Sequence, residues 1–277
     1  MSTATAAAAP APLLAVEGLA KSYGGVEAVR GVSFALVRGE ILALIGPNGA
    51  GKSTCFNMLN GQIAPDGGRV RLEGRDIAGL PPRAIWRRGV GRTFQVAATF
   101  GSMTVRENVQ AALLSHAGRR LTLAGVAFRQ ELGAADGLLA MVGLAAQADR
   151  PCAELAYGDL KRLELGVALT NAPSLLLMDE PTAGMAPGER VDLMRLVAGI
   201  ARRRGIGVLF TEHDMDVVFE HADRVLVLDR GALIAEGSPK AVRADARVRA
   251  IYLGEGLLYR AAAAPASAPQ APSGVAP

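Results

Sequence analysis

The sequence has only two cysteines and lacks a long apolar run. Its two cysteines, Cys55 and Cys152, lack metal-ligand spacing and are too few for a disulfide framework, so we expect both to be small buried hydrophobic residues. No apolar run reaches the roughly 18 residues that a membrane-spanning helix needs. The stretch LTLAGVAF, residues 121–128, is too short to cross a bilayer, and we interpret it as a buried or interfacial helix.

An excess of charge of one sign is also missing. The 30 Lys and Arg residues and the 26 Asp and Glu residues leave a formal net charge of +4. Because basic and acidic residues are interspersed along the chain, no basic stripe is visible and no nucleic-acid partner is expected. The N-terminal MSTATAAAAPAPLL has no basic segment and is broken by Pro10 and Pro12, so we predict no secretory signal and expect a cytoplasmic protein.

What the sequence does contain is an alternation of short apolar runs with helical patterns. Half of its residues are hydrophobic, which is typical of a globular chain. Apolar residues at helical spacing predict a helix over residues 187–204. The alternation favours an α/β layer fold with a mostly parallel sheet for the later strands. The predicted strands are residues 39–46, 67–74, 174–180, 207–213 and 224–229.

Composition also predicts where the domain begins and ends. Residues 1–12 and 259–277 are rich in Ala and Pro and have nothing large to bury, so we expect disordered tails around one domain spanning 13–258. Between about residues 104 and 170 the chain lacks strand signals. We therefore expect a helical subdomain, at about residues 96–170, inserted in the sheet domain.

The glycines and lysine of IGPNGAGKST predict a phosphate-binding loop. Gly46, Gly51, Lys52 and Ser53 fit G-x-x-x-x-G-K-[ST] between an apolar strand and a helix start. Glycines let consecutive N–H groups surround an anion, and the helix N-terminus adds positive charge. The lysine can hold the β- and γ-phosphates, and the serine hydroxyl can ligate Mg²⁺. The other expected nucleotide contacts are Asn48, Gly49, Ala50 and Thr54.

An ordinary glycine-rich turn is the alternative interpretation. The chain has only four lysines, Lys21, Lys52, Lys161 and Lys240, and otherwise uses arginine. A planar guanidinium would not fit such a loop as a compact ammonium does. The lysine at this position therefore favours phosphate binding.

Two carboxylates follow the apolar run LLLM, at the predicted strand end where open α/β sheets bind ligands. Asp179 would hold Mg²⁺ directly or through water, and Glu180 would orient and deprotonate a water that attacks the γ-phosphate. Taken alone, the DEP sequence is equally consistent with an exit from a strand. The phosphate loop elsewhere in the chain favours the catalytic interpretation.

Two more polar residues end apolar runs. His213, in FTEHD, is expected at the same sheet edge, where it could contact the γ-phosphate, although a lone histidine is more often structural. Gln95 ends the short run GRTFQ, and a glutamine by itself is usually a surface residue.

The motifs and their order resemble the ATP-binding-cassette (ABC) ATPases over residues 13–255. The resemblance implies a P-loop NTPase fold with a mixed sheet core, an antiparallel β subdomain and an inserted helical subdomain. It implies ATP and Mg²⁺ as cofactors, and catalytic and metal-binding roles for Gln95. It also implies that Tyr23 offers its ring to adenine, the alternative being a buried structural tyrosine. LAYGD, residues 155–159, resembles the family's signature, so Ala156 and Gly158 are expected to face nucleotide.

Two departures from the family pattern stand out. The signature usually reads L-S-G-G-Q, so Ala156 replaces a serine and Tyr157 replaces a glycine. Ala186 stands where many members have an aspartate. We therefore assume neither a hydroxyl contact from the signature nor an aspartate contact across a dimer.

Three segments resemble one subfamily, the cassettes of branched-chain amino-acid uptake systems. These segments are L-x-Y-G-x-x-x-R-L-E, EHDMDVV and RVRAIYLGEG. Similar endings occur in urea and amide uptake cassettes and in the lipopolysaccharide-export cassette, which remain alternatives.

The resemblance implies an ATPase that energises solute import from the cytoplasmic face of the inner or plasma membrane. Cassettes of this family pair head to tail, so the implied partners are a second cassette, identical or not, membrane-spanning permease subunits and, indirectly, a solute-binding protein. We expect contact with a cytoplasmic helix of the permease at residues 96–109. The alternative is that apolar residues there, such as Phe100 and Met103, belong to the core.

Three other classes fit the sequence less well. Soluble cassettes of DNA repair or translation would carry a second cassette or a long coiled-coil insertion, and neither pattern occurs here. A small-molecule kinase would not need Glu180 beside Asp179. A nucleotide-binding scaffold without catalysis would be expected to lose Glu180.

Overall fold

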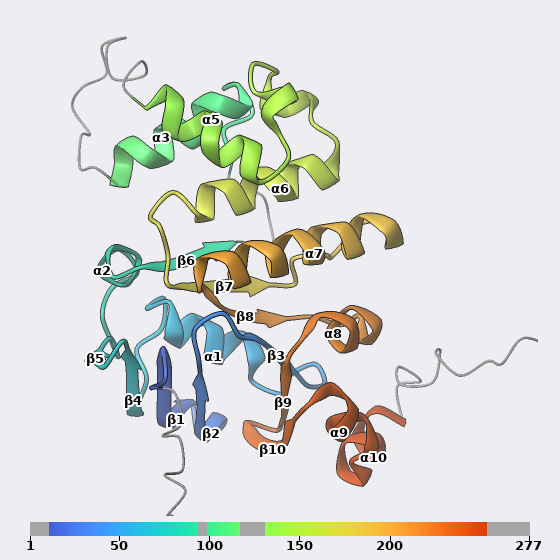
Figure 1. Ribbon diagram of the computed structural model, residues 1–277. Coiled ribbons are helices and arrows are strands. Elements are labelled where there is room, and N and C mark those ends of the chain that lie inside the picture. Colours follow the sequence, from blue (N-terminus) through green and yellow to red (C-terminus); the bar gives the residue numbers. More distant parts are fainter. Residues whose placement is uncertain (1–10, 94–98, 117–130, 254–277) are drawn as a thin grey trace, which may run out of the picture.

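The computed structural model describes residues 11–93, 99–116 and 131–253 and contains two sheets and a group of helices (Figure 1). Gln95 and the helix predicted at residues 121–128 lie outside the described residues.

The larger sheet carries the ends of the strands that hold the predicted site. Its order is β10-β9-β3-β8-β7-β6. All neighbours pair in parallel except β10, which is antiparallel to β9. The carboxyl ends of β3, β8 and β7 therefore lie side by side at one edge. The strands are β3 (Ile41–Ile45), β6 (Val90–Thr93), β7 (Leu175–Asp179), β8 (Gly207–Thr211), β9 (Arg224–Asp229) and β10 (Ala232–Gly237).

A second, antiparallel sheet has the order β2-β1-β4-β5. Its strands are β1 (Leu14–Tyr23), β2 (Val26–Leu36), β4 (Gly67–Leu72) and β5 (Arg75–Asp76). The five strands predicted from apolar runs are confirmed as β3, β4, β7, β8 and β9, whereas the apolar pattern does not predict β1, β2, β5, β6 and β10. In β1 the alternation is broken where register shifts interrupt its pairing with β2.

Alternate residues of the larger sheet face two different cores. In β3, Ile41, Ala43 and Ile45 pack in one cluster, while Leu42 and Leu44 pack in the other. The first cluster includes residues of α7 (Pro187–Arg204) and α8 (Met215–His221), and the second includes α1 (Lys52–Leu59) and the antiparallel sheet. Because both faces are covered, the central strands are apolar throughout, as parallel strands usually are.

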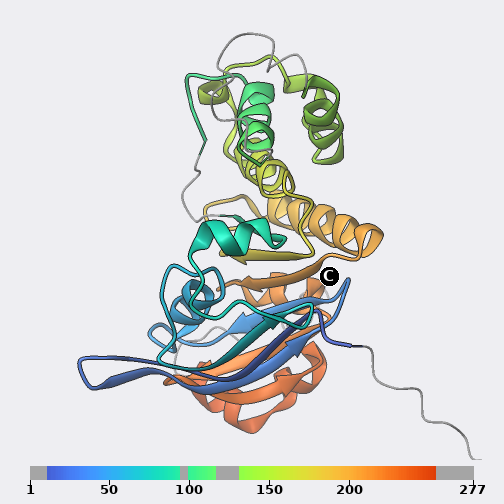
Figure 2. The same ribbon diagram turned by 90° about the vertical axis from the view of Figure 1, so that its left-hand side faces the viewer.

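The described part of the segment between β6 and β7 is mainly helical. It contains α3 (Val105–His116), α5 (Leu132–Met141) and α6 (Tyr157–Ala168), with 3₁₀ turns at Ala145–Gln147 and Cys152–Glu154. These helices form a layer beyond the larger sheet (Figure 2). In the described part of 104–170, the one β-type pairing is an isolated bridge between Thr104 and Pro151, so this segment is helical as expected.

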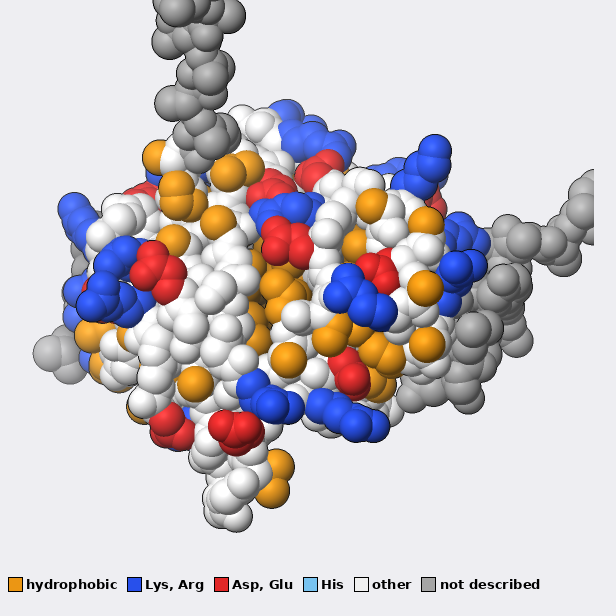
Figure 3. Space-filling model, turned by 90° about the horizontal axis from the view of Figure 1, so that it is seen from below, with side chains coloured by type: hydrophobic (Ala, Val, Ile, Leu, Met, Phe, Trp, Pro, Cys, Tyr) orange, Lys and Arg blue, Asp and Glu red, His pale blue; other side chains and the backbone are white. Residues whose placement is uncertain are grey.

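The remaining helices are α2 (Pro82–Arg87), α9 (Pro239–Ala244) and α10 (Ala246–Leu253). Within the described ranges, no helix combines the length and apolarity needed to cross a bilayer. Cys55 and Cys152 are buried free thiols, as expected, and burial raises the pKa of Cys55 to about 12. On the face built by the antiparallel sheet and the C-terminal elements, basic and acidic side chains are interspersed (Figure 3).

Candidate functional site

The predicted phosphate loop lies between the end of β3 and the start of α1, and packing leaves no room for a side chain at its first and last glycines. A methyl group at Gly46 would lie 2.2 Å from the carbonyl oxygen of Leu228. A methyl group at Gly51, whose φ is +102°, would lie 2.4 Å from the carbonyl oxygen of Ala28. Since a side chain fits at neither position, the loop presents bare backbone at both ends.

Lys52 opens α1 and points back over this loop. Its ammonium is buried and donates hydrogen bonds to the carbonyl oxygens of Gly46, at 2.6 Å, and Pro47, at 3.0 Å. Ser53 is exposed and Thr54 half-buried on the same first turn, and no side chain caps the N-terminus of α1. The loop thus combines a fixed cation, a hydroxyl and a helix N-terminus, which together suit a polyphosphate.

Asp179 ends β7 and is oriented by its neighbour in the sheet. The hydroxyl of Thr211, its register partner on β8, donates to Oδ1 of Asp179 at 2.7 Å. Its Oδ2 lies 3.7 Å from Nη2 of Arg92 on β6. Burial lowers the pKa of Arg92, and the charge of Asp179 opposes that shift. These contacts hold the carboxylate in one orientation at the strand end.

Glu180 and His213 meet at the same edge. Nε2 of His213 lies 2.8 Å from Oε1 of Glu180. Glu180 has a left-handed backbone, with φ of +48°, which is strained for a residue with a side chain. Its amide donates to the carbonyl and hydroxyl oxygens of Thr211, each at 3.1 Å. The turn therefore aims the Glu180 carboxylate at the histidine.

The signature segment contacts the loop that follows β7. Ala156 is the exposed N-cap of α6 and makes no side-chain cap. The hydroxyl of Tyr157 donates to the carbonyl oxygen of Ala183 at 3.1 Å. Gly158 is buried, and a methyl group there would lie 3.0 Å from Oε1 of Glu189 on α7. Tyr157, which departs from the family pattern, thus makes a contact of its own.

Tyr23 lies at the end of β1 with 46% of its surface exposed. The interpretation of Tyr23 as a buried structural residue is therefore wrong. Nζ of Lys21 lies 5.6 Å from the centre of its ring. An exposed aromatic ring is able to stack on a base. The contact between Tyr23 and adenine therefore agrees with the structure and stays a prediction.

The structure adds polar residues that sequence reasoning missed. Glu212 is 4% exposed, and its Oε1 accepts hydrogen bonds from the amide and hydroxyl of Thr182, at 2.8 and 2.6 Å. Burial raises the pKa of Glu212. Glu212 lies between Thr211 and His213. The run of polar residues at the end of a buried strand is therefore the sequence signal that could have identified Glu212 as a site residue. Arg92 and Arg190 carry no comparable signal, because the carboxylates that they contact, Asp179 and Asp214, are distant in the chain.

The donors at this edge fit Mg²⁺ bound together with a phosphate. The Ser53 hydroxyl and the Asp179 carboxylate are hard oxygen ligands, which Mg²⁺ prefers. In the part of the chain that the structure describes, no group of three or more His, Cys, Asp and Glu residues could hold a metal alone. An ion here would need oxygens from its substrate, as Mg²⁺ in nucleotide sites does.

Comparison with known proteins tests the resemblance directly. The ABC transporter family profile matches residues 29–183, and the profile "Branched-chain amino acid ATP-binding cassette transporter" matches residues 232–257. The high-affinity branched-chain amino acid transport ATP-binding proteins BraF of Pseudomonas aeruginosa and LivG of Escherichia coli are each 40% identical to this chain. The matches span 252 and 251 residues and cover 88% of this chain and 98% of each relative.

Solved structures agree with the sequence relatives. The ADP conformation of MJ1267, an ATP-binding cassette of an ABC transporter, matches with a TM-score of 0.78 and 32% identity. The match covers 88% of this chain and 99% of that one. The expected fold class and the family resemblance are confirmed: this chain belongs to the ATP-binding cassette family of transporter ATPases.

Proposed function

We propose that this protein hydrolyses ATP to energise the import of branched-chain amino acids. The contact between Glu180 and His213, at the sheet edge that also carries the phosphate loop, is the observation that carries the catalytic part. The profile match at residues 232–257 and the names of the 40% identical relatives support the choice of solute.

Each residue of the edge has a chemical task in this proposal. Lys52 and the loop amides hold the β- and γ-phosphates, while Ser53 and Asp179 hold Mg²⁺. The ion supplies charge neutralisation at the phosphates when it is bound. Glu180 orients the attacking water and accepts its proton, and His213 holds the Glu180 carboxylate and contacts the γ-phosphate. Gln95 is proposed to join them in binding metal and water.

A cytoplasmic helix of a permease subunit is the proposed occupant of a groove beside the site. The cavity has a volume of about 350 Å³ and lies between α2, β6 and the ends of α3 and α6. Its lining includes the apolar side chains of Trp86 and Val90 and the basic side chains of Arg83 and Arg92. An occupant with an apolar face and an acidic group would fit this lining and could pair with Arg92. Arg92 also lies beside Asp179, so the occupant would contact a residue next to the proposed metal site.

Phe100, which belongs to the segment expected to contact the permease, also supports permease docking. It is 59% exposed, so the interpretation that places it in the core is wrong. Met103 is half-buried. Aromatic side chains are enriched at protein interfaces. The protein would then sit at the cytoplasmic face of the membrane, bound through its permease and paired with a second cassette.

Co-purification from membranes tests this function. The wild-type protein should show Mg²⁺-dependent ATPase activity and should recover membrane subunits in a pull-down. Phe100→Ala should weaken that recovery, whereas Val26→Ala, which removes a 70% exposed side chain from β2, should not. Recovery with ribosomes or DNA in place of a membrane complex would contradict the proposal.

A second candidate is lipopolysaccharide export. The export-system ATP-binding protein LptB of Haemophilus influenzae is 35% identical over 243 residues, covering 88% of this chain. Urea or amide import is a further alternative from the C-terminal pattern. Uptake of labelled leucine by membrane vesicles, with and without this chain, separates amino-acid import from the other functions.

A further inference from the structure

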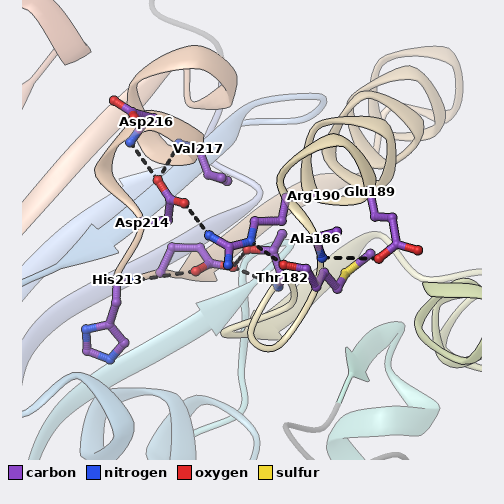
Figure 4. Close-up of polar contacts among 10 residues, drawn as sticks. Thr182, Ala186, Glu189, Arg190, His213, Asp214, Asp216 and Val217 are labelled. Atoms are coloured by element: carbon purple, nitrogen blue, oxygen red, sulfur yellow. Dashed lines mark hydrogen bonds and ion pairs between the residues drawn. The ribbon is translucent and has the colours of Figure 1, made fainter. Parts of the chain in front are cut away.

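The loop that carries His213 is tied to the loop after β7 by two polar links that lie outside the phosphate-binding residues (Figure 4). One link joins Glu212 to Thr182, and the other joins Asp214 to Arg190. His213 lies between the two links in the chain, so both act on the backbone that holds its ring.

The first link is buried. Besides its two hydrogen bonds from Thr182, Glu212 accepts one from the amide of His213, with Oε2 as acceptor at 3.2 Å. One carboxylate therefore binds the histidine's own backbone and the loop after β7. This link fixes only the N-terminal side of His213.

The second link fixes the other side. Arg190, in the first turn of α7, donates from Nη1 to Oδ2 of Asp214 at 2.5 Å and from Nε to the carbonyl oxygen of Met185 at 2.8 Å. The other oxygen of Asp214 caps α8 by accepting the amides of Asp216 and Val217, at 3.0 and 3.4 Å. The Arg190 guanidinium thus bridges the loop after β7 and the start of α8.

We propose that Arg190 is a positioning residue for ATP hydrolysis. By donating to both the Asp214 carboxylate and the Met185 carbonyl, Arg190 fixes the His213 backbone relative to the turn that carries Glu180. It thereby keeps the His213 imidazole in contact with the Glu180 carboxylate. Arginine suits this task because its planar fork presents donors in two directions, whereas a lysine ammonium is a single flexible point charge. The proposal rests on the function proposed above, since the aligned pair is the one that acts on ATP.

The matched variants are Arg190→Gln, Arg190→Lys and Arg195→Gln. Arg195 lies on the same helix, but its side chain is 66% exposed and its ion pairs, with Asp192 and Glu220, are at the surface. Arg190→Gln should lower kcat by roughly 10- to 100-fold, because small displacements of catalytic groups cost that much. ATP affinity should change by less than about twofold, since the phosphate loop is untouched. Arg190→Lys should be intermediate, and Arg195→Gln should match wild type.

Histidine NMR separates positioning from a general loss of structure. In Arg190→Gln the ring signals of His213 should shift, while those of His116, at the end of α3, should not. Asp214→Asn keeps a residue that can cap α8 but loses the charge, so it should reproduce the kcat loss. The double variant should be no worse than the poorer single variant, because one link is broken either way.

Two outcomes would overturn the role of Arg190. They are a wild-type kcat with unmoved His213 signals in Arg190→Gln, or fully additive losses in the double variant. If Arg190→Gln does not fold, Arg190→Lys and Asp214→Asn carry the same test. A wild-type protein without Mg²⁺-dependent ATPase activity would instead refute the proposed function, and the His213 signals would still report whether Arg190 positions the ring.

Discussion

Nε2 of His213 lies 2.8 Å from Oε1 of Glu180, so residues of two separate sequence motifs are in direct contact. Glu180 directly follows β7, and His213 follows the end of β8. Because β7 and β8 pair in parallel, both side chains emerge at the same edge. The proposed catalytic carboxylate and its histidine are thus brought together by strand pairing.

Replacing Glu180 by glutamine should stop turnover and preserve ATP binding. The amide keeps the shape of the side chain but cannot accept the proton of water, and loss of a general base costs roughly 10²- to 10⁴-fold. Gel filtration with ATP and Mg²⁺ should show a trapped dimer. Glu220→Gln, on the surface of α8, should behave as wild type. A species that stays monomeric would argue against an ATP site shared by two cassettes.

Lys52→Ala should abolish ATP binding or hydrolysis. The change removes the ammonium that the carbonyl oxygens of Gly46 and Pro47 hold over the loop. Lys240→Ala removes the same charge at an exposed position of α9 and serves as the control. Equilibrium binding of a fluorescent ATP analogue checks the prediction. Equal affinity and equal turnover in the two variants would refute the role of the loop.

Gly46→Ala should destabilise the fold far more than Gly39→Ala. A methyl group at Gly46 would meet the Leu228 carbonyl oxygen at 2.2 Å, whereas one at Gly39, with φ of +75°, meets nothing within 4 Å. Gly39→Ala should cost about 1–2 kcal/mol for its left-handed backbone. Gly46→Ala adds a steric clash and should exceed about 3 kcal/mol. Denaturant unfolding measures both, and equal losses would show that the loop can relax.

Ala156→Ser should stabilise the protein. Ala156 has the extended backbone of an N-cap, but no side chain that can accept a hydrogen bond from the first turn of α6. A serine there should add about 1 kcal/mol, which corresponds to a rise in Tm of about 2–4 °C. Ala153→Ser, in the 3₁₀ turn before α6, is the control because it caps no α-helix. The same Tm change in both variants would contradict the capping explanation.

His221 should make stability fall in acid. Its side chain is buried, and burial lowers its pKa from the ordinary value of 6.5. Glu220 opposes this shift, and Arg195 and Arg202 reinforce it. Below pH 6.5 the histidine of the unfolded chain binds a proton, whereas the buried His221 of the folded chain binds it less readily. The free energy of unfolding therefore decreases as the pH falls below about 6.5.

The matched variants for this test are His221→Gln and His116→Gln. Between about pH 7 and about pH 5, His221→Gln should lose less stability than wild type. His116 is exposed, so His116→Gln should follow the wild-type profile. Thermal unfolding across this pH range measures the difference, and parallel profiles for all three proteins would contradict the prediction.

The sequence alone predicted the elements whose signals are local. The phosphate loop needs a contiguous strand, glycine turn and helix start, so Gly46 to Thr54 could be recognised from order and spacing. The buried strands β3, β7 and β8 are continuous apolar runs because both of their faces are covered. Their ends pointed to Asp179, Glu180 and His213. The family pattern supplied the antiparallel sheet as an element but not its strand boundaries.

The tertiary structure alone decided the contacts between distant segments. The pairing of β1 with β2 and β4 contains register shifts that no simple alternation reveals. The clash that keeps residue 46 a glycine comes from Leu228. The bridge from Arg190 to Asp214 and the bond from Tyr157 to Ala183 join residues 24 and 26 positions apart. Residue spacing along a chain determines only the geometry of residues that are close in sequence. The contacts between distant residues form because packing of the two cores brings separate loops to the same edge of the larger sheet.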